Sequence, residues 1–161
     1  MLINRIIKIF LLIIFFASNS FAQKGYKNPE EYAKAADKLF EKGEFQKAFV
    51  YYQTLRSNEM GNPDYNFRLG VCMMYSEPEK KERPINYFEI AIKFNIEDNR
   101  VYYYLGRAYH NNYRFTEAKA SYEKYKELAS GRLIKGFDID RRIQECSNGI
   151  ALLSSINLLY V

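Results

Sequence analysis

The stretch Val-Tyr-Tyr-Tyr-Leu-Gly-Arg-Ala-Tyr, from Val101 to Tyr109, decides the fold of this chain. Aromatic and small residues follow one another there in helical steps, and the same mixture continues downstream with Ala118 and Tyr122. Two antiparallel helices cross closely only where a small residue leaves room, so we expect Gly106 and Ala118 at the crossing, with aromatic side chains around them. The stretch therefore predicts a pair of helices joined by a turn.

Two similar units precede it at a spacing of about 34 residues. The unit at 63–98 repeats Leu-Gly, whereas the unit at 29–62 has Ala35 and Ala36 in that place. In the middle unit Pro84 stands where a small residue is expected, and because proline is tolerated in the first turn of a helix, we expect its second helix to begin late. The residues expected to pack the units together are Tyr32, Ala48, Tyr52, Leu69, Gly70, Phe88, Ala91, Tyr102, Leu105, Gly106, Tyr109, Ala118 and Tyr122.

This ordered set resembles the tetratricopeptide repeat (TPR) consensus, in which an aromatic residue precedes Leu-Gly, a tyrosine, a small residue and another aromatic. The resemblance covers 29–129 and implies an all-α solenoid of three helix-turn-helix repeats, at 29–62, 63–98 and 99–129. The alternative is an ordinary bundle of amphipathic helices, but such a bundle has no reason to repeat these residues in matched order.

After the repeats, residues 130–137 contain two glycines and a serine and are expected to form a linker. Residues 138–154 then carry apolar residues in steps of three and four, which predicts a helix that caps the exposed end of the third repeat. The uncharged tail, 155–161, resembles the start of an extended strand and of a further downstream domain. The apolar positions of the capping helix are Ile139, Ile143, Cys146, Ile150 and Leu153.

Residues 1–22 have the pattern of an export signal. Arg5 and Lys8 precede an apolar run, and small residues at Ser20 and Ala22 mark a cleavage site. A retained membrane anchor is the alternative, but the run is shorter than the roughly 20 residues that span a bilayer. We therefore expect an exported, periplasmic protein without stable membrane insertion after cleavage, with 23–28 as a short linker.

The leader, repeats and terminal helix together resemble the N-terminal portion of larger envelope proteins of the Bacteroidetes type, which continue into an OmpA-type peptidoglycan-binding domain. This resemblance implies association with a cell-wall or outer-membrane complex. Whether the chain is complete or a shortened relative stays open at this point.

Composition argues against several classes of function. The 24 basic and 19 acidic residues alternate along the expected helix surfaces, whereas a nucleic-acid interface wants a concentrated basic stripe. The single histidine, His110, has no acidic neighbour in sequence, and the chain contains no glycine-rich phosphate loop, so we expect neither an enzyme nor a metal or cofactor site. Cys72 and Cys146 lie on repeats or helices too far apart for a disulfide and are expected to be free.

The resemblance also implies where a partner would bind, because the first helix of each repeat lines the concave face in this family. The groove would run from acidic through apolar to basic, with Phe67, Tyr75 and Tyr103 as anchors and Arg107 receiving a carboxylate. The lysine and asparagine clamp of the chaperone-binding members is not reproduced. The implied groove residues are Asp37, Phe40, Asp64, Phe67, Val71, Met74, Tyr75, Arg100, Tyr103, Arg107, His110 and Asn111, with Glu30, Ala33 and Glu41 at the first end.

Three functions follow as hypotheses. The first is an exported protein-interaction scaffold that binds a peptide or helix in this groove. The second is a structural spacer whose units associate end to end, and the third is a binder of a glycan or small ligand, suggested by 15 tyrosines. A competing interpretation of the groove is that its residues pack against the chain's own uncharged tail or against the segment next to the leader.

Overall fold

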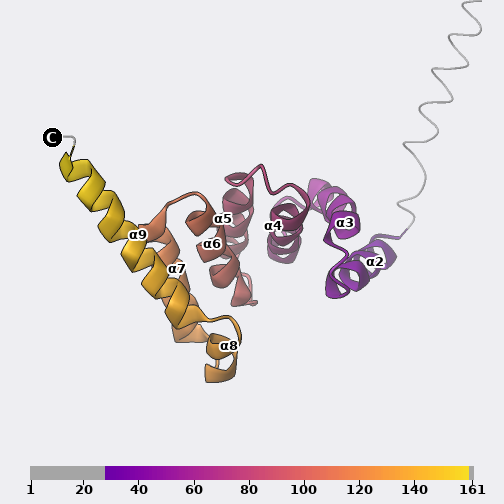
Figure 1. Ribbon diagram of the computed structural model, residues 1–161. Helices are drawn as coiled ribbons and strands as arrows, with labels where there is room; N and C mark the ends of the chain where they lie inside the picture. The colour runs from indigo at the N-terminus through magenta and orange to yellow at the C-terminus, as the bar shows by residue number, and fades with distance from the viewer. Residues whose placement is uncertain (1–27, 160–161) are drawn as a thin grey trace, which may run out of the picture.

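The computed structural model describes residues 28–159, and within them it contains eight helices (Figure 1). The proposed leader, all but the last residue of the linker that follows it, and residues 160–161 of the tail lie outside the described part. The helices are α2 (Pro29–Glu41), α3 (Phe45–Asn58), α4 (Pro63–Ser76), α5 (Arg83–Lys93), α6 (Arg100–Asn111), α7 (Phe115–Leu128), α8 (Gly131–Gly136) and α9 (Ile139–Leu159).

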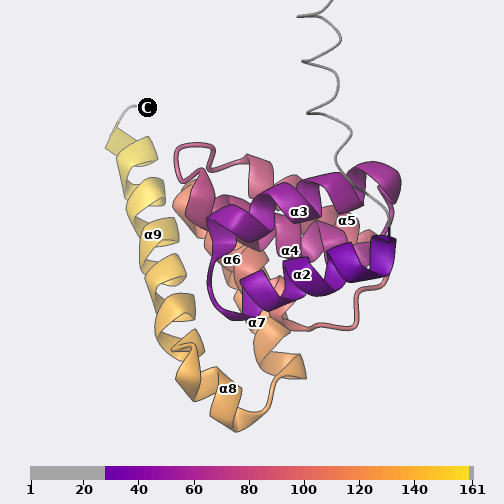
Figure 2. The same cartoon turned by 90° about the vertical axis from the view of Figure 1, so that its right-hand side faces the viewer.

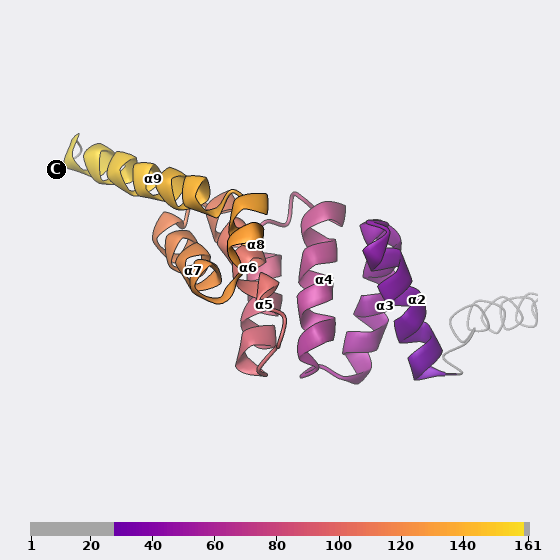
Figure 3. The ribbon, with the colours of Figure 1, turned by 90° about the horizontal axis from the view of Figure 1, so that it is seen from below.

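The helices form successive antiparallel pairs, α2 with α3, α4 with α5 and α6 with α7, and each pair packs on the next. Figure 3 shows them following one another from α2 at one end to α9 at the other. This arrangement is an all-helical TPR solenoid, as the sequence predicted. The turns close tightly: Gly43, between α2 and α3, has φ of +73°, a conformation that favours glycine.

Glycines set the distance between the helices of the second and third pairs. A Cβ atom added to Gly70 would come within 2.6 Å of the Phe88 ring, and one added to Gly106 would come within 2.7 Å of Tyr122. Pro84 is buried at the start of α5 and does not prevent this contact, because it occupies the first turn, where its missing N–H is not needed. Small residues on one helix therefore receive aromatic rings from the other.

Most of the residues expected to pack the repeats are buried in two hydrophobic clusters, while Tyr32 and Tyr102 are half-buried. One cluster joins the first pair to α4 and contains Ala36, Tyr52 and Leu69. The other runs through the second and third pairs into α9 and contains Phe88 and Tyr122. Successive repeats thus share their cores through the helices between them.

The segments after the third pair differ from the sequence-based expectation. Residues 131–136, expected within a linker, form the short helix α8, and α9 continues to Leu159, so the tail up to that residue is helical and the predicted strand is wrong. The helical spacing of its apolar residues continues past 154, and the described chain offers no strand with which an extended tail could pair.

The long helix α9 packs on α7, where an added Cβ at Gly149 would come within 2.6 Å of the Phe115 ring. Its C-terminal end extends past α7 (Figures 1 and 3), and Figure 2 shows α9 running along one side of the repeats. Leu152, Leu153 and Ile156 on this extension are exposed. Among residues 28–159 no helix is long and apolar enough to cross a membrane.

Cys72 and Cys146 are both buried and both free, as expected. Burial raises the pKa of Cys72 to about 12 and that of Cys146 to about 11, so both stay protonated thiols at neutral pH. They act as small core residues.

Candidate functional site: the face of α2, α4 and α6

Each of the helices α4 and α6 sends an arginine back to the first helix of the preceding repeat. Arg68 in α4 pairs with Asp37 in α2, and Arg107 in α6 donates a hydrogen bond from Nη1 to the Tyr75 hydroxyl in α4 over 2.9 Å. Because these links join consecutive first helices, the face on which they lie is continuous over the three repeats. This is the face that the sequence assigned to partner binding.

The first link neutralises the charge of Asp37 at the first end of the face. The Tyr52 hydroxyl donates to Oδ1 of Asp37 over 2.6 Å, and Arg68 contacts the same carboxylate and the Tyr52 hydroxyl. Burial raises the pKa of Tyr52, and its hydrogen bond to Asp37 raises it further, so the phenol remains a donor. Asp37 is therefore already satisfied by its own chain. The family positions used to predict the groove do not include Arg68, and sequence reasoning missed it.

In the second link, between Arg107 and Tyr75, the guanidinium group has no carboxylate partner among residues 28–159. The Tyr75 ring stacks on Phe45, with centroids 4.5 Å apart and planes 15° apart, and Tyr75 is 46% exposed. The guanidinium carbon of Arg107 lies 5.5 Å from the centre of the Tyr75 ring and 5.8 Å from that of Tyr104. Within the described chain no acidic group lies at ion-pair distance from Arg107.

These rings hold Arg107 through cation–π contacts and a neutral hydrogen bond, which leave its charge uncompensated. Burial raises the pKa of Tyr104 to about 12, so this neighbour also stays neutral. Beside the stacked pair, Phe45 and Tyr75 border a shallow hollow of about 490 Å³, whose other lining residues are Gly43, Glu44, Gln46 and Lys47. The arrangement offers a positive charge next to an exposed aromatic surface.

Three predicted groove residues point inward instead, which corrects the sequence analysis. Phe67 is 1% exposed, Val71 0% and Tyr103 5%. Phe67 packs against Phe88 and Tyr104, because α4 is enclosed by the helices on either side of it. A first helix in the middle of a stack therefore keeps only a narrow arc open, and Phe67 is not available as an anchor. Tyr103 is covered by the ring of Phe137.

The remaining predicted residues are spread around this face. Asp64 is exposed, Phe40 is half-buried beneath Arg68, and Arg100 pairs with Asp98 over 2.5 Å. Burial alone would raise the pKa of Asp98, but the hydrogen bonds from Arg100 outweigh it and hold that pKa below its usual value. The expected gradient from acidic to basic is thus altered: Asp37 and Arg100 are paired within the chain, and Arg107 is, among the described residues, an unpaired cation near the middle. At the first end, Glu30 and Glu41 are exposed and Ala33 is half-buried.

A thiol and an imidazole meet at the third repeat. Nδ1 of His110 lies 3.9 Å from Sγ of Cys146, and the imidazole ring stands edge-on to Phe115. Because the buried thiol stays protonated at neutral pH, this pair does not supply a thiolate nucleophile. It is a packing contact between α6 and α9.

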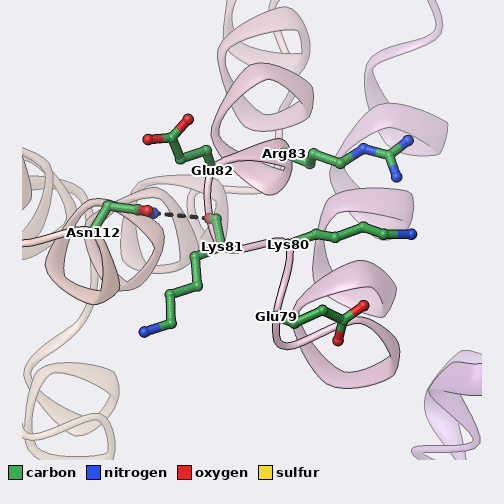
Figure 4. A pocket seen from close by; sticks show the side chains of 6 residues that line it. All are labelled: Glu79, Lys80, Lys81, Glu82, Arg83 and Asn112. Atoms are coloured by element: carbon green, nitrogen blue, oxygen red, sulfur yellow. Dashed lines mark hydrogen bonds between the residues drawn. The ribbon is translucent and has the colours of Figure 1, made fainter.

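A second hollow lies at the connection between α4 and α5, where Asn112 donates from Nδ2 to the carbonyl oxygen of Lys81 over 2.8 Å. Figure 4 shows that the charged side chains around it diverge and do not point toward a common centre. Lys80 and Arg83 both pair with Glu77. Met74 and Asn111 border a smaller hollow beside the same connection. The hydrogen bond of Asn112 fixes the connection between α4 and α5 to the end of α6. The side chains around the two hollows do not converge on a ligand site.

Solved structures with the same fold are tetratricopeptide domains. The first TPR domain of Spaghetti (RPAP3), bound to an HSP90 peptide, aligns with a TM-score of 0.64 and 18% identity over 79% of this chain and 96% of that one. The type III secretion chaperone SycD of Yersinia enterocolitica, in complex with a peptide of the translocator YopD, gives 0.62 and 14% over 78% and 96%. The Sgt2 TPR domain from Aspergillus fumigatus gives 0.60 and 19% over 79% and 82%.

Comparison with protein-family models and with curated proteins gave no match. The fold therefore defines the class as a tetratricopeptide solenoid, and at these identities the likeness extends to the fold alone.

Proposed function

We propose that this chain is an exported protein-interaction scaffold that binds an extended peptide or a helix of a partner protein on the face of α2, α4 and α6. The observation that carries the proposal is the uncompensated guanidinium of Arg107 beside the exposed, stacked ring of Tyr75. Aromatic and arginine side chains provide most of the binding energy in protein interfaces when they become desolvated. A partner carboxylate would pair with Arg107, and an apolar side chain would cover Tyr75.

Two of the solved structures with this fold contain a bound peptide, from HSP90 and from YopD respectively. These complexes support a binding role over a catalytic one. We further propose that the chain works in the cell envelope, in a cell-wall, outer-membrane or secretion-associated assembly. This part rests on the pattern of residues 1–22 and on the resemblance to envelope proteins, and it is tested by the mass of the protein recovered from cells, which should begin at Gln23.

The binding face is tested by placing a photo-activatable amino acid at Tyr75 and identifying what it crosslinks in cells. A defined partner, lost when Arg107→Ala is added while circular dichroism is unchanged, supports the proposal. The matched control places the same amino acid at Val50, which is 56% exposed on α3. If both positions give the same products, or if Arg107→Ala leaves the Tyr75 product intact, the assignment of this face is wrong.

A second candidate, self-association, is favoured by the exposed residues Leu152, Leu153 and Ile156 on the extension of α9. From Ser147 to Leu159 this helix has no charged side chain, so two copies could approach without repulsion. Sedimentation of the chain from Gln23 onward decides the matter, because a mass that does not change with concentration would remove this candidate. No comparable observation favours a glycan site, since five of the tyrosines, Tyr52, Tyr103, Tyr109, Tyr122 and Tyr125, are buried.

A further inference from the structure

The third repeat keeps its part of the binding face covered by the chain itself. The ring of Phe137, directly after α8, lies on Tyr103 with centroids 4.3 Å apart, and 5.9 Å from Tyr125. The carbonyl oxygen of Phe137 accepts a hydrogen bond of 3.0 Å from Nε of Arg142, whose guanidinium carbon lies 5.4 Å from the centre of the Tyr103 ring. Phe137 thus places both an aromatic ring and a backbone hydrogen-bond acceptor beside Tyr103.

The surroundings of Phe137 contain more hydrogen-bond donors than acceptors. The hydroxyl groups of Tyr122 and Tyr125 are buried, and neither has a partner at full hydrogen-bond geometry within residues 28–159, although Arg142 lies near the hydroxyl of Tyr122. Arg107 and Arg142 both lie over the ring of Tyr103, and the described residues place no carboxylate at ion-pair distance from either. Because buried polar groups are normally hydrogen-bonded, such a set calls for an explanation. An incoming acceptor would find two guanidinium groups here, and the carbonyl oxygen of Phe137 engages only that of Arg142.

The segment that covers this place is held by few contacts. No residue of α8 is buried, and only Ile134 and Phe137 of the segment pack, half-buried, against the core. Leu133 is 44% exposed. Added Cβ atoms at Gly131 and Gly136 would meet nothing within 4 Å, so neither end of α8 is locked against a neighbour. Displacing the segment would break the contacts of these two side chains and the hydrogen bond from Arg142 to the carbonyl oxygen of Phe137.

We propose that Phe137 is an internal pseudo-ligand, which occupies the third-repeat part of the binding face and is displaced by a partner peptide that presents an aromatic side chain next to a carbonyl or carboxylate acceptor. The aromatic side chain takes the place of the Phe137 ring on Tyr103, and the acceptor takes the place of its carbonyl at Arg142. This inference rests on the proposed function and adds to it the chemistry of the partner and a competition with the chain's own segment.

The experiment uses the chain from Gln23 to Val161, in the wild-type form and with Phe137→Ala, and a synthetic peptide of residues 130–139 as the probe. Backbone amide resonances of Tyr103 and Tyr125 are followed by NMR during titration. The wild-type segment acts at an effective concentration on the order of 1 mM, so it keeps the site filled only if the vacated chain binds the peptide with a dissociation constant on the order of 0.1 mM or lower. The wild-type chain, whose site is occupied by its own Phe137, should bind the peptide at least tenfold more weakly.

Two controls accompany the titration. A peptide in which Phe137 is replaced by Ala should not shift either resonance, and a chain with Leu133→Ala, an exposed position of α8, should behave as the wild type. If Phe137→Ala lowers the helix content, the same titration is made with Phe137→Leu, which keeps apolar volume without the ring. Equal binding by wild-type and vacated chains, or no binding by a folded vacated chain, overturns the proposal.

This outcome is separable from that of the crosslinking at Tyr75, because the titration needs no natural partner. Crosslinking at Tyr75 without peptide binding at Tyr103 would leave the scaffold function standing and remove the pseudo-ligand. Peptide binding at Tyr103 without a crosslinked partner at Tyr75 would support the replaceable contact of Phe137. It would contradict the proposal that a partner binds at Tyr75.

Discussion

Nη1 of Arg107 lies 2.9 Å from the hydroxyl oxygen of Tyr75, so a side chain of α6 holds the exposed ring of α4 in position. Removing the hydroxyl with Tyr75→Phe should lower the free energy of unfolding by about 0.5–1.5 kcal/mol, the usual net value of one hydrogen bond. In an Arg107→Ala background the same change should cost close to nothing. Denaturant unfolding of the four chains measures this coupling, and additive effects would show that the two residues do not interact in solution.

Replacement of Gly106 tests the crossing of the third pair. In Gly106→Ala the new Cβ would stand 2.7 Å from the Tyr122 ring, so the helices must separate, and we expect a loss of about 1–3 kcal/mol in the free energy of unfolding. Gly131→Ala is the matched control, because its Cβ meets nothing within 4 Å and alanine favours a helix. Thermal unfolding, followed by circular dichroism, measures the midpoint of each variant. We expect a lower midpoint than that of the wild type for Gly106→Ala only. Equal midpoints would contradict the close crossing.

The turn between α2 and α3 depends on a backbone conformation and not on space. Gly43 has φ of +73° and nothing within 4 Å of an added Cβ, so Gly43→Ala should cost about 1 kcal/mol of stability through the backbone alone. Gly43→Asn should cost less, because asparagine tolerates this region, as Asn95 does at φ of 59° in the same chain. Urea unfolding of both variants provides the comparison, and an alanine variant as stable as the asparagine one would refute the explanation.

Asp98 should make the free energy of unfolding depend on pH in the acidic range. Its Oδ1 accepts hydrogen bonds from the backbone N–H and from Nε of Arg100, over 3.0 and 2.9 Å, and these contacts keep its pKa in the folded state below the unfolded value. The stabilisation is therefore present above the unfolded pKa of about 3.9 and is lost as the pH falls through the lower folded value.

We expect Asp98→Asn to reduce the free energy of unfolding at pH 7 by about 0.2–1 kcal/mol, the usual value of a partly exposed ion pair, because asparagine can keep the hydrogen bond from the backbone N–H of Arg100 but not the charge that pairs with its guanidinium. The difference between the two chains should shrink as the pH is lowered toward 2. Urea titrations at a series of pH values measure it. A difference that stays constant over this range would show that the charge of Asp98 is not the cause.

The pairing of helices could be predicted from the sequence because it depends on contacts that recur in the second and third repeats. Gly70 meets Phe88 and Gly106 meets Tyr122 at corresponding places, so the pattern appears more than once along the chain. The contact of Gly149 with Phe115 occurs once, at the junction with α9, and no spacing in the sequence indicated it. The contacts of Gly70 and Gly106 could be predicted because the same residue pattern occurs twice.

The proposed binding face was only partly predictable for a related reason. Helical spacing places Tyr103 and Arg107 on one side of α6, but which of them is exposed depends on the neighbouring segments. Phe137 covers Tyr103 from a part of the chain that has no counterpart in the earlier repeats. Arg68 was missed because it is not one of the family positions from which the groove was predicted, although it pairs with Asp37.

Helix α4 divides its buried side chains between the two hydrophobic clusters, with Leu69 and Cys72 in one and Phe67 and Val71 in the other. If α2 and α3 detach, the second cluster keeps all of its buried members, since none of them comes from those two helices. The chain can therefore open in stages from its N-terminal side, and amide hydrogens of α3 should exchange with solvent before those of α6 and α7.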